Sequence, residues 1–368
     1  MSDLAERSFE RILIIKPSSA GDILHALPVL RAVRGRFPSA HIAWLVAASF
    51  ADLLSAEPEL NEVIPFERHR FARLGRSAAV TRDFLAFVGA MRSRRYDLAI
   101  DLQGLFRSAF LARASGAPTR VGFAEAREFA PLFYTHRVRG GDAEMHAADR
   151  NRLVAVALGC DDSSTDVCLT LREADRAAAA ALLEGAGARA ADGCAVLAPA
   201  TRWETKCWPA ERYGRLARLI RERAGLSSVL VGGRADEAAG RAAEAASDGA
   251  AVNLCGRTTL RTLAAVVAGA RVVVSGDSTP MHLAAAFGRP LVALFGPTNP
   301  RRTGPYGRDA DVLRVDLDCS PCYLRRRAQC PYEHACMERL TVESVAEVAV
   351  ARVGRRAARL VPHAEPRP

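Results

Sequence analysis

Short apolar segments that each lead into a polar turn and then into a helical pattern recur along the whole chain. In the first half they are the segments 11–16, 41–46, 63–66, 96–104 and 120–123. In the second half they are the segments 194–199, 228–233, 251–254, 272–275 and 291–295. Short runs of uniformly apolar, β-branched residues are typical of strands buried on both faces. The alternation of such strands with helices predicts an α/β protein with doubly wound parallel sheets.

The second series of strands begins after a predicted helix at 173–186, so the chain divides near its middle. A length of 368 residues is sufficient for two separate cores. We expect an N-terminal Rossmann-like domain at 1–170, a C-terminal Rossmann-like domain at 171–345, and a helix and tail at 346–368, with an amphipathic helix over 341–360. The two halves would face a cleft, with the turns that follow their strands on its walls.

The most informative turn follows the apolar strand 272–275. It offers an acid, two hydroxyls and a histidine, which are Asp277, Ser278, Thr279 and His282. Ligands bind beyond the carboxyl ends of strands in open parallel sheets, so this turn is a candidate ligand site. A structural role is the alternative, in which Asp277 caps a helix that begins near Thr279 and has Pro280 in its first turn. We expect both roles.

Three further strand-end loops carry polar residues. The first strand is followed by Ser18, Ser19, Gly21 and Asp22, at the start of a helix. Asp22 would repel a phosphate there, but it suits the acceptance of a proton from a sugar hydroxyl; helix capping is the alternative. In the second half, Thr201 and Lys206 offer a hydroxyl and an ammonium to a diphosphate, and Glu237 is able to accept hydrogen bonds from a ribose.

Two familiar nucleotide-binding motifs are absent from the sequence. It has neither G-x-G-x-x-G nor the P-loop lysine motif. This argues against dinucleotide oxidoreductases and P-loop enzymes.

The net charge of +10 indicates a negatively charged partner, such as nucleic acid, an anionic membrane surface or a phosphorylated substrate. Eight arginines and only two acids lie between positions 66 and 95. We expect no aromatic stacking platform beside them, which argues against single-stranded nucleic acid; a solvated helix face is the alternative. Of the 51 basic residues only Lys16 and Lys206 are lysines. A compact ammonium is not interchangeable with a guanidinium at a tight anion site.

Signals for export and for membrane insertion are lacking. No apolar run approaches the ~20 residues that span a bilayer. Residues 1–11 lack the apolar core of a secretory signal, so we expect a cytosolic protein. Nine cysteines in such a chain argue against a disulfide scaffold.

Five ordered motifs carry a resemblance to a known family. They are the segments 14–28, 101–104, 201–209, 276–283 and 295–298. On these motifs the chain resembles the ADP-heptose:lipopolysaccharide heptosyltransferases of glycosyltransferase family 9, and the resemblance covers essentially residues 11–345. The resemblance implies the GT-B fold of two Rossmann-like domains. The first half is most similar to the heptosyltransferase I branch, on the segments 101–109, 126–134 and 146–152.

This resemblance implies an inverting transfer of L-glycero-D-manno-heptose from ADP-heptose to the Kdo of Kdo–lipid A, in the synthesis of the lipopolysaccharide inner core. Asp22 would be the general base, and no metal or other cofactor would be required for the chemistry. The residues implied in donor binding are Thr201, Lys206, Glu237, Asp277, Ser278, Thr279 and His282. Those implied in acceptor binding are Lys16, Ser18, Ser19, Gly21, Arg70, Arg73, Arg127, His146 and Arg150.

Two features depart from the family pattern. Pro280 removes a backbone donor from the turn that would hold the diphosphate. A cluster of four cysteines is not typical of heptosyltransferase I and resembles other branches of the family; it consists of Cys319, Cys322, Cys330 and Cys336. Four thiolates at these spacings suit a structural zinc or iron site, and reduced thiols are the alternative.

Several functions therefore stay open beside heptosyltransferase I. They are a heptosyltransferase II-like enzyme, a protein-modifying heptosyltransferase, a non-catalytic sugar-nucleotide or lipid-binding protein, and an epimerase or hydrolase on the same fold. We expect a monomer that works peripherally at the cytoplasmic face of the inner membrane. Its partners would be the sugar nucleotide, the lipid acceptor or inner-core lipopolysaccharide, and the anionic membrane surface, but not nucleic acid.

Overall fold

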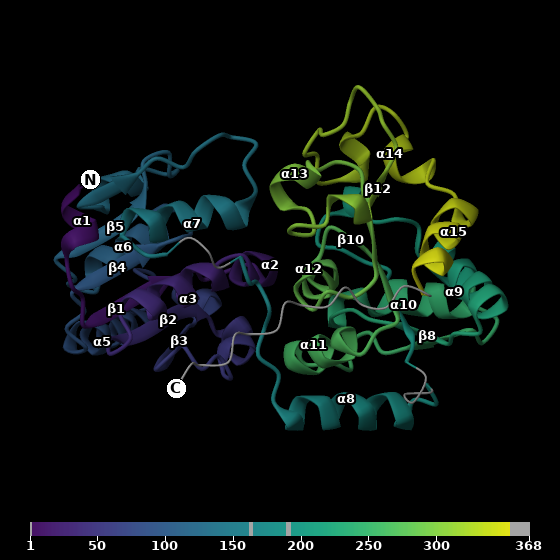
Figure 1. The fold of residues 1–368 in the computed structure, drawn as a ribbon, viewed down its shortest axis with the longest axis horizontal. Coiled ribbons are helices and arrows are strands. Elements are labelled where there is room, and N and C mark those ends of the chain that lie inside the picture. The colour runs from purple at the N-terminus through teal and green to yellow at the C-terminus, as the bar shows by residue number, and fades with distance from the viewer. Residues whose placement is uncertain (1, 162–164, 189–192, 354–368) are drawn as a thin grey trace. The chain divides into compact units, whose positions relative to one another are not determined.

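The computed structural model describes residues 2–161, 165–188 and 193–353 of the chain. The chain divides into two compact units, Met1–Thr170 and Leu171–Pro368 (Figure 1). Each unit contains one sheet of six strands. All pairs of neighbouring strands in both sheets are parallel.

The sheet of the first unit has the strand order β3-β2-β1-β4-β5-β6. Its strands are β1 (Arg11–Ile15), β2 (His41–Ala47), β3 (Glu62–Phe66), β4 (Leu98–Asp101), β5 (Thr119–Phe123) and β6 (His136–Val138). Its α-helices are α1 (Ser2–Glu6), α2 (Ala20–Leu24), α3 (Leu27–Arg36), α4 (Arg68–Phe71), α5 (Ala78–Ser93), α6 (Phe106–Ala114) and α7 (Ala147–Ala157). Two 3₁₀ helices occupy Ala48–Leu54 and Ala130–Phe133.

The sheet of the second unit has the strand order β12-β11-β10-β7-β8-β9. Its strands are β7 (Ala195–Ala198), β8 (Ser228–Leu230), β9 (Ala251–Asn253), β10 (Val272–Gly276), β11 (Leu291–Phe295) and β12 (Val312–Arg314). Its α-helices are α8 (Glu173–Gly185), α9 (Ala210–Ala224), α10 (Glu237–Ala245), α11 (Leu260–Ala268), α12 (Thr279–Ala286), α13 (Pro300–Thr303), α14 (Ala335–Glu338) and α15 (Val342–Val353). Four 3₁₀ helices occupy Glu204–Lys206, Arg234–Asp236, Asp309–Asp311 and Arg327–Gln329.

In each sheet the first and the fourth strand of the unit, in chain order, lie side by side at the centre. In the first unit β1 pairs with β4, and in the second unit β7 pairs with β10. At these pairs the strand order reverses, and in open α/β sheets the loops that leave such a pair diverge at its carboxyl edge, where ligands are expected. We use the word crevice for the carboxyl edge of each sheet at this central pair. The turns that the sequence singled out leave from β1, β7 and β10, and therefore lie at the two crevices.

Buried residues from strands and helices form one core on one face of the second sheet. Trp208 and Tyr213 lie in this core, beside buried valines of β10 and residues of α15. Their rings meet edge to face with centroids 5.0 Å apart, and the Trp208 indole donates a hydrogen bond of 2.9 Å to the carbonyl of Leu340. This bond fixes the chain where it enters α15, so the terminal helix is part of the second unit's core.

The helices α8 and α11 pack against each other in the same unit and share a buried ion pair. Arg261 of α11 donates to Asp175 of α8, and both side chains are almost fully buried. The hydrogen bonds from Arg261 hold the pKa of Asp175 well below its usual range.

The predicted strands are all present, but several are shorter than expected. The segment 96–104 is a strand only over β4, and 228–233 only over β8. The predictions missed β6 and β12, which have three residues each and lie at sheet edges, where the apolar pattern is weak. Of the helix expected at 341–360, the structure has Val342–Val353, and residues 354–368 lie outside the described part.

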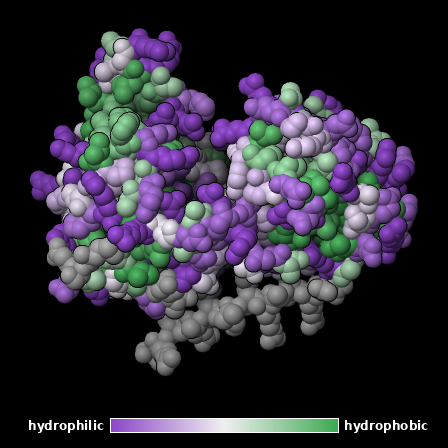
Figure 2. All heavy atoms as spheres, turned by 90° about the horizontal axis from the view of Figure 1, so that it is seen from above, coloured by the Kyte–Doolittle hydropathy of each residue, from purple (hydrophilic) through white to green (hydrophobic). Residues whose placement is uncertain are grey.

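Large apolar side chains are exposed mainly on the first unit, among the described residues. They are Leu74, Leu85, Phe106, Phe110, Phe129, Leu132 and Val156, with Tyr323 and Tyr332 on the second unit. Hydrophobic residues also reach the face that Figure 2 shows, between hydrophilic ones. Within the described residues, no helix combines the length and the apolar character that crossing a membrane requires.

Candidate functional site

The loop after β1 holds Asp22 in a fixed orientation. One carboxylate oxygen of Asp22 accepts hydrogen bonds from the Ser19 amide, at 2.9 Å, and from the Ser19 hydroxyl, at 2.7 Å. These are capping bonds at the start of α2, so the capping role considered for Asp22 is real. The side chain nevertheless stays 42% exposed. Hydrogen bonds to Oδ2 orient the carboxylate, and the side chain is still accessible to solvent. Asp22 is therefore able to receive a proton.

Lys16 connects this loop to the neighbouring strand. Its side chain is buried, and its Nζ donates a 2.9 Å hydrogen bond to the carbonyl of Leu102, just beyond β4. The same Nζ lies 3.9 Å from Oδ1 of Asp22. Lys16 therefore links the loops of both central strands. Ser18 and Gly21 belong to the same loop and helix start.

Asp101, at the end of β4, organises the second loop of this crevice. Its fully buried carboxylate accepts hydrogen bonds from the Tyr134 hydroxyl at 2.7 Å, the Ser108 hydroxyl at 2.8 Å and the amide of Gln103 at 2.9 Å. Burial raises the pKa of Asp101, and these hydrogen bonds oppose that shift. Gly122 makes room for the Tyr134 ring, since a Cβ there would lie 2.4 Å from it. The sequence pointed to the motif that contains Asp101 but not to this positioning role.

Five of the residues predicted to bind the acceptor lie outside the loop of Asp22, and they fall into two groups. Arg127, His146 and Arg150 lie near the crevice. The Arg127 amide donates 3.0 Å to the carbonyl of Gly104, and the His146 ring lies edge to face with His25, just after α2, at 4.8 Å. The Arg150 guanidinium stacks on the Phe123 ring at 4.5 Å.

Arg70 and Arg73 form the other group, in and after α4. Arg70 pairs with Asp83 of α5, and Arg73 is exposed. Among the described residues, Arg70 and Arg73 interact only within α4, α5 and the turn between them, and no hydrogen bond or ion pair joins these two arginines to the loop of Asp22.

Asp277 is the centre of the crevice in the second unit. Its side chain is 7% exposed, and Lys206 Nζ lies 2.6 Å from Oδ2. The same oxygen accepts hydrogen bonds from the hydroxyls of Thr298, at 2.9 Å, and Thr303, at 3.4 Å. His282 Nε2 lies 3.8 Å from Oδ1. Asp277 thus joins the loops that follow β7, β10 and β11.

The cap of α12 differs from the expected one. The N-cap is Ser278 rather than Asp277, and the Ser278 hydroxyl bonds with that of Ser275 at 2.9 Å. The capping alternative for Asp277 is therefore wrong, because its oxygens face Lys206 and the threonines instead. Thr279 is the first residue of α12, and Pro280 lies in its first turn, as predicted.

Lys206 is held from two sides. Its ammonium lies 4.4 Å above the centre of the Trp203 ring, and the Arg325 guanidinium lies 4.8 Å from the same ring. Thr201 supports the loop, since its hydroxyl donates 2.9 Å to the carbonyl of Trp203. A Cβ at Gly276 would lie 3.0 Å from the Lys206 carbonyl, so glycine permits this close approach. Sequence analysis did not predict that Trp203 and Arg325 would be neighbours of Lys206.

Glu237 lies one strand further along the sheet, at the start of α10 after β8. Its side chain is 47% exposed, and Arg241 lies 3.6 Å from its carboxylate. A Cβ at Gly256 would lie 2.6 Å from Glu237 Oε1, so the loop after β9 also approaches it closely. Glu237 is accessible to a ligand at this edge of the sheet.

The segment that carries the four cysteines packs against the Lys206 loop. The Thr205 hydroxyl donates 2.5 Å to the carbonyl of Leu324, and His334 Nε2 lies 2.5 Å from the Thr205 carbonyl. The amide of Arg327 donates 3.1 Å to Glu204. The cysteine segment is therefore part of the support of the Lys206 loop.

All four predicted ligands line one small cavity of about 40 Å³; they are Cys319, Cys322, Cys330 and Cys336. Burial and the three neighbouring thiols raise the pKa of Cys336 to about 11. Nowhere in the described ranges are three or more His, Cys, Asp or Glu side chains arranged to hold a metal ion. All nine cysteines are free thiols.

The family model of glycosyltransferase family 9 (heptosyltransferase) matches residues 84–335. The chain is 35% identical over 315 residues to lipopolysaccharide heptosyltransferase 1 of Salmonella typhimurium. The aligned region covers 84% of this chain and 94% of that protein. It is 34% identical over 333 residues to lipopolysaccharide heptosyltransferase 1 of Pseudomonas aeruginosa, with 88% of each covered. Lipopolysaccharide heptosyltransferase 2 of Salmonella typhimurium is 31% identical over 320 residues, 83% of this chain and 88% of that protein.

Among solved structures, Escherichia coli heptosyltransferase WaaC with ADP-2-deoxy-2-fluoro heptose has a TM-score of 0.72 at 30% identity, over 92% of this chain and 98% of that chain. The E. coli ADP-heptose lipopolysaccharide heptosyltransferase II has a TM-score of 0.74 at 27% identity, over 93% of this chain and 98% of that chain. The predicted fold class, two Rossmann-like parallel-sheet units of the GT-B type, is confirmed. The chain belongs to glycosyltransferase family 9, the heptosyltransferases, and is a glycosyltransferase.

Proposed function

We propose that the chain is a lipopolysaccharide heptosyltransferase I, which transfers L-glycero-D-manno-heptose from ADP-heptose to the Kdo of Kdo–lipid A. The observation that carries the proposal is the identity of 34–35% to relatives named lipopolysaccharide heptosyltransferase 1, over more than four fifths of the chain. The polar groups at the two crevices match what each half of such a reaction requires.

Asp22 is the proposed general base. Its carboxylate takes the proton of the acceptor hydroxyl while that oxygen attacks the anomeric carbon of the donor. The bond between this carbon and the ADP oxygen breaks in the same step, so the configuration inverts. Ser19 holds one carboxylate oxygen by two hydrogen bonds and thereby orients the other toward the acceptor. No second acid is needed, because ADP leaves as an anion.

The crevice of the second unit is the proposed donor site. An ammonium has three donors, and Asp277 uses one of those of Lys206, so others remain for the diphosphate. Thr201, Ser278, Thr279 and His282 would complete the diphosphate and heptose contacts, and Glu237 would accept from the ribose. The base and the donor site belong to different units, so the reaction requires both.

The acceptor is a lipid, so we also propose that the enzyme works as a peripheral protein at the cytoplasmic face of the inner membrane, as a monomer. Lys16, Arg127, His146 and Arg150 would face the carboxylate and phosphates of the acceptor, and Arg70 and Arg73 would add positive charge. A heptosyltransferase II-like activity is the second candidate, because the 31% identical relative bears that name.

We expect heptose to be added to Kdo–lipid A in preference to heptosyl-Kdo–lipid A when both acceptors compete for ADP-heptose, as read by mass spectrometry. The reverse preference would identify a heptosyltransferase II-like enzyme. Breakdown of ADP-heptose without any acceptor would instead indicate a hydrolase or an epimerase.

Replacing Asp22 with Asn should lower kcat by at least about a hundredfold, because Asn keeps the capping bond but cannot take a proton. The affinity for ADP-heptose should stay unchanged in calorimetry. The matched control is Asp142→Asn, an exposed acid of the same unit, which should retain full activity. Turnover retained by Asp22→Asn would exclude it as the base.

Replacing Lys206 with Ala should weaken ADP-heptose binding about tenfold or more, since a charge-assisted hydrogen bond contributes ~1.5–3 kcal/mol. Calorimetric titration with ADP measures the effect, and thermal unfolding shows whether the protein stays folded. Arg223→Ala, an exposed cation on α9, is the matched control and should bind ADP normally. An unchanged ADP affinity in Lys206→Ala would remove Lys206 from the donor site.

The metal site at the four cysteines stays a prediction. We propose that the four thiolates, which line one cavity, take up one structural zinc or iron ion per chain, and that binding draws them into the ligand arrangement that the described structure does not show. Metal analysis of the purified protein should find about one ion, and the double variant Cys322→Ser/Cys330→Ser should lose it. Cys255→Ser, a buried cysteine outside the cluster, should keep the metal. A wild-type protein without zinc or iron would refute the proposal.

A further inference from the structure

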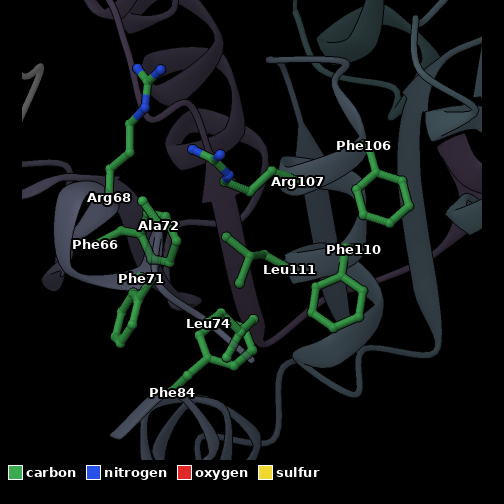
Figure 3. A pocket seen from close by; sticks show the side chains of 10 residues that line it. All are labelled: Phe66, Arg68, Phe71, Ala72, Leu74, Phe84, Phe106, Arg107, Phe110 and Leu111. Carbon is green, nitrogen blue, oxygen red and sulfur yellow. The ribbon is translucent and has the colours of Figure 1, made fainter. Parts of the chain in front are cut away.

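An open apolar pocket of about 390 Å³ lies within the first unit, and its lining includes none of the residues assigned to the reaction, although Arg70 and Arg73 belong to the same helix and turn as part of its wall. It is formed by the end of β3, by α4 and the turn after it, and by α5 and α6. Its lining residues, all labelled in Figure 3, are Phe66, Arg68, Phe71, Ala72, Leu74, Phe84, Phe106, Arg107, Phe110 and Leu111.

The aromatic rings of the pocket form a continuous row. Phe71 contacts both Phe66 and Phe84, with centroids 5.3 and 5.2 Å away, and Phe84 stacks with Phe110 at 6.3 Å. Phe110 stacks in turn with Phe106 at 6.3 Å. Phe66 and Phe84 in this row are buried, so the row is a packed wall of the pocket rather than an open platform on which bases could stack. Residues far apart in the sequence come together only through the packing of α4, α5 and α6.

The walls of this pocket are unusually exposed for apolar residues. Leu74 is 42% exposed, Phe106 49% and Phe110 36%. Beyond Phe106, the 3₁₀ helix at Ala130–Phe133 extends the apolar surface, where Leu132 is 73% exposed. Contiguous exposed apolar surface of this kind on a soluble protein marks a site for a protein, a membrane or a ligand.

Arginines form the rim of the pocket. The guanidinium groups of Arg68 and Arg107 extend to the same side of it in Figure 3. Neither makes an ion pair with any residue in the described ranges, and Arg73 and Arg76 are exposed in the turn after α4. No acidic residue lines the pocket. The site therefore combines an apolar floor with positive charge that the protein itself does not neutralise.

We propose that this pocket is a docking site for an anionic phospholipid bilayer. One acyl chain occupies the phenylalanine pocket, and the phosphate of its headgroup meets Arg68 and Arg107. The combination of apolar insertion and arginine–phosphate attraction is the chemistry that holds peripheral proteins on anionic bilayers. A soluble anion would leave the apolar floor unused, and an apolar protein surface would leave the arginines unpaired. The inference deepens the proposed function, on which it rests for the need to reach a lipid acceptor.

The test compares vesicle binding by the full-length wild type and by full-length variants with substitutions in the pocket. Wild-type protein should co-sediment with vesicles of phosphatidylcholine and phosphatidylglycerol, and much less with phosphatidylcholine alone. The variant Leu74→Ser/Phe106→Ser should bind the anionic vesicles about tenfold or more weakly, equal to about 1.4 kcal/mol or more. Arg68→Gln/Arg107→Gln should weaken binding and reduce its dependence on salt. Val156→Ser, an exposed apolar residue on α7, is the matched control and should bind as wild type.

Activity separates this proposal from the proposed function. On an acceptor from which the acyl chains have been removed, Leu74→Ser/Phe106→Ser should act like the wild type, whereas transfer to acceptor in vesicles should fall. Vesicle binding that is absent in the wild type, or unchanged in this variant, would overturn the docking site whatever the enzyme transfers. A loss of activity on the acyl-free acceptor, together with a lower Tm, would also overturn it. Vesicle binding through the pocket without heptosyl transfer would leave the docking site standing and refute the proposed function.

Discussion

The second unit is organised around one buried carboxylate. Asp277 holds Lys206 at 2.6 Å and receives the hydroxyls of Thr298 and Thr303. Breaking a buried ion pair from one side costs about 3–5 kcal/mol, so each partner fixes the other in place. The pair exists only because β7 and β10 are neighbours, which brings their loops to one edge. The cysteine segment then supports the same loop through Thr205. The packing of the cysteine segment thus helps to fix the position of the Lys206 ammonium.

The first unit repeats this arrangement with other residues. Lys16 is buried after the first strand of its sheet and lies 3.9 Å from the more exposed Asp22, whereas the partly buried Lys206 follows the first strand of the other sheet and lies 2.6 Å from Asp277. In a chain whose remaining basic residues are arginines, both lysines lie where the loops of two central strands meet. A guanidinium is a wide, planar group with five donors, whereas an ammonium is a compact point charge, so the two are not interchangeable beside a carboxylate. The two sheets share one strand order, and this places the two lysines at corresponding junctions.

The sequence predicted the strand-end turns well, because a turn after a buried strand is a local pattern. The positions of Asp22, Lys206 and Asp277 beyond the ends of strands could be predicted from such turns alone. The network around Asp101 could not, since Tyr134 reaches it from another part of the chain and Gly122 only leaves space for the ring.

The apolar pocket and the cap of α12 show the same limit. The pocket is assembled from phenylalanines between positions 66 and 110, and no periodicity connects them. Ser278 replaces Asp277 as the N-cap because Lys206, distant in sequence, claims the carboxylate. In both cases the structure depends on contacts between side chains that are distant in sequence, and a local sequence pattern does not reveal such contacts.

The proline in the first turn of α12 reduces the number of backbone donors that this turn can offer to an anion. A helix N-terminus usually offers several free amides. Here Pro280 has none, and the amides of Met281 and His282 already donate to the Ser278 carbonyl at 3.1 and 3.4 Å. Fewer backbone donors therefore remain for a diphosphate at this turn. Lys206 and Arg325, both stacked on Trp203, supply positive charge beside the same turn. In the proposed donor site, the side-chain charge of Lys206 and Arg325 would take the place of the backbone donors that this helix terminus lacks.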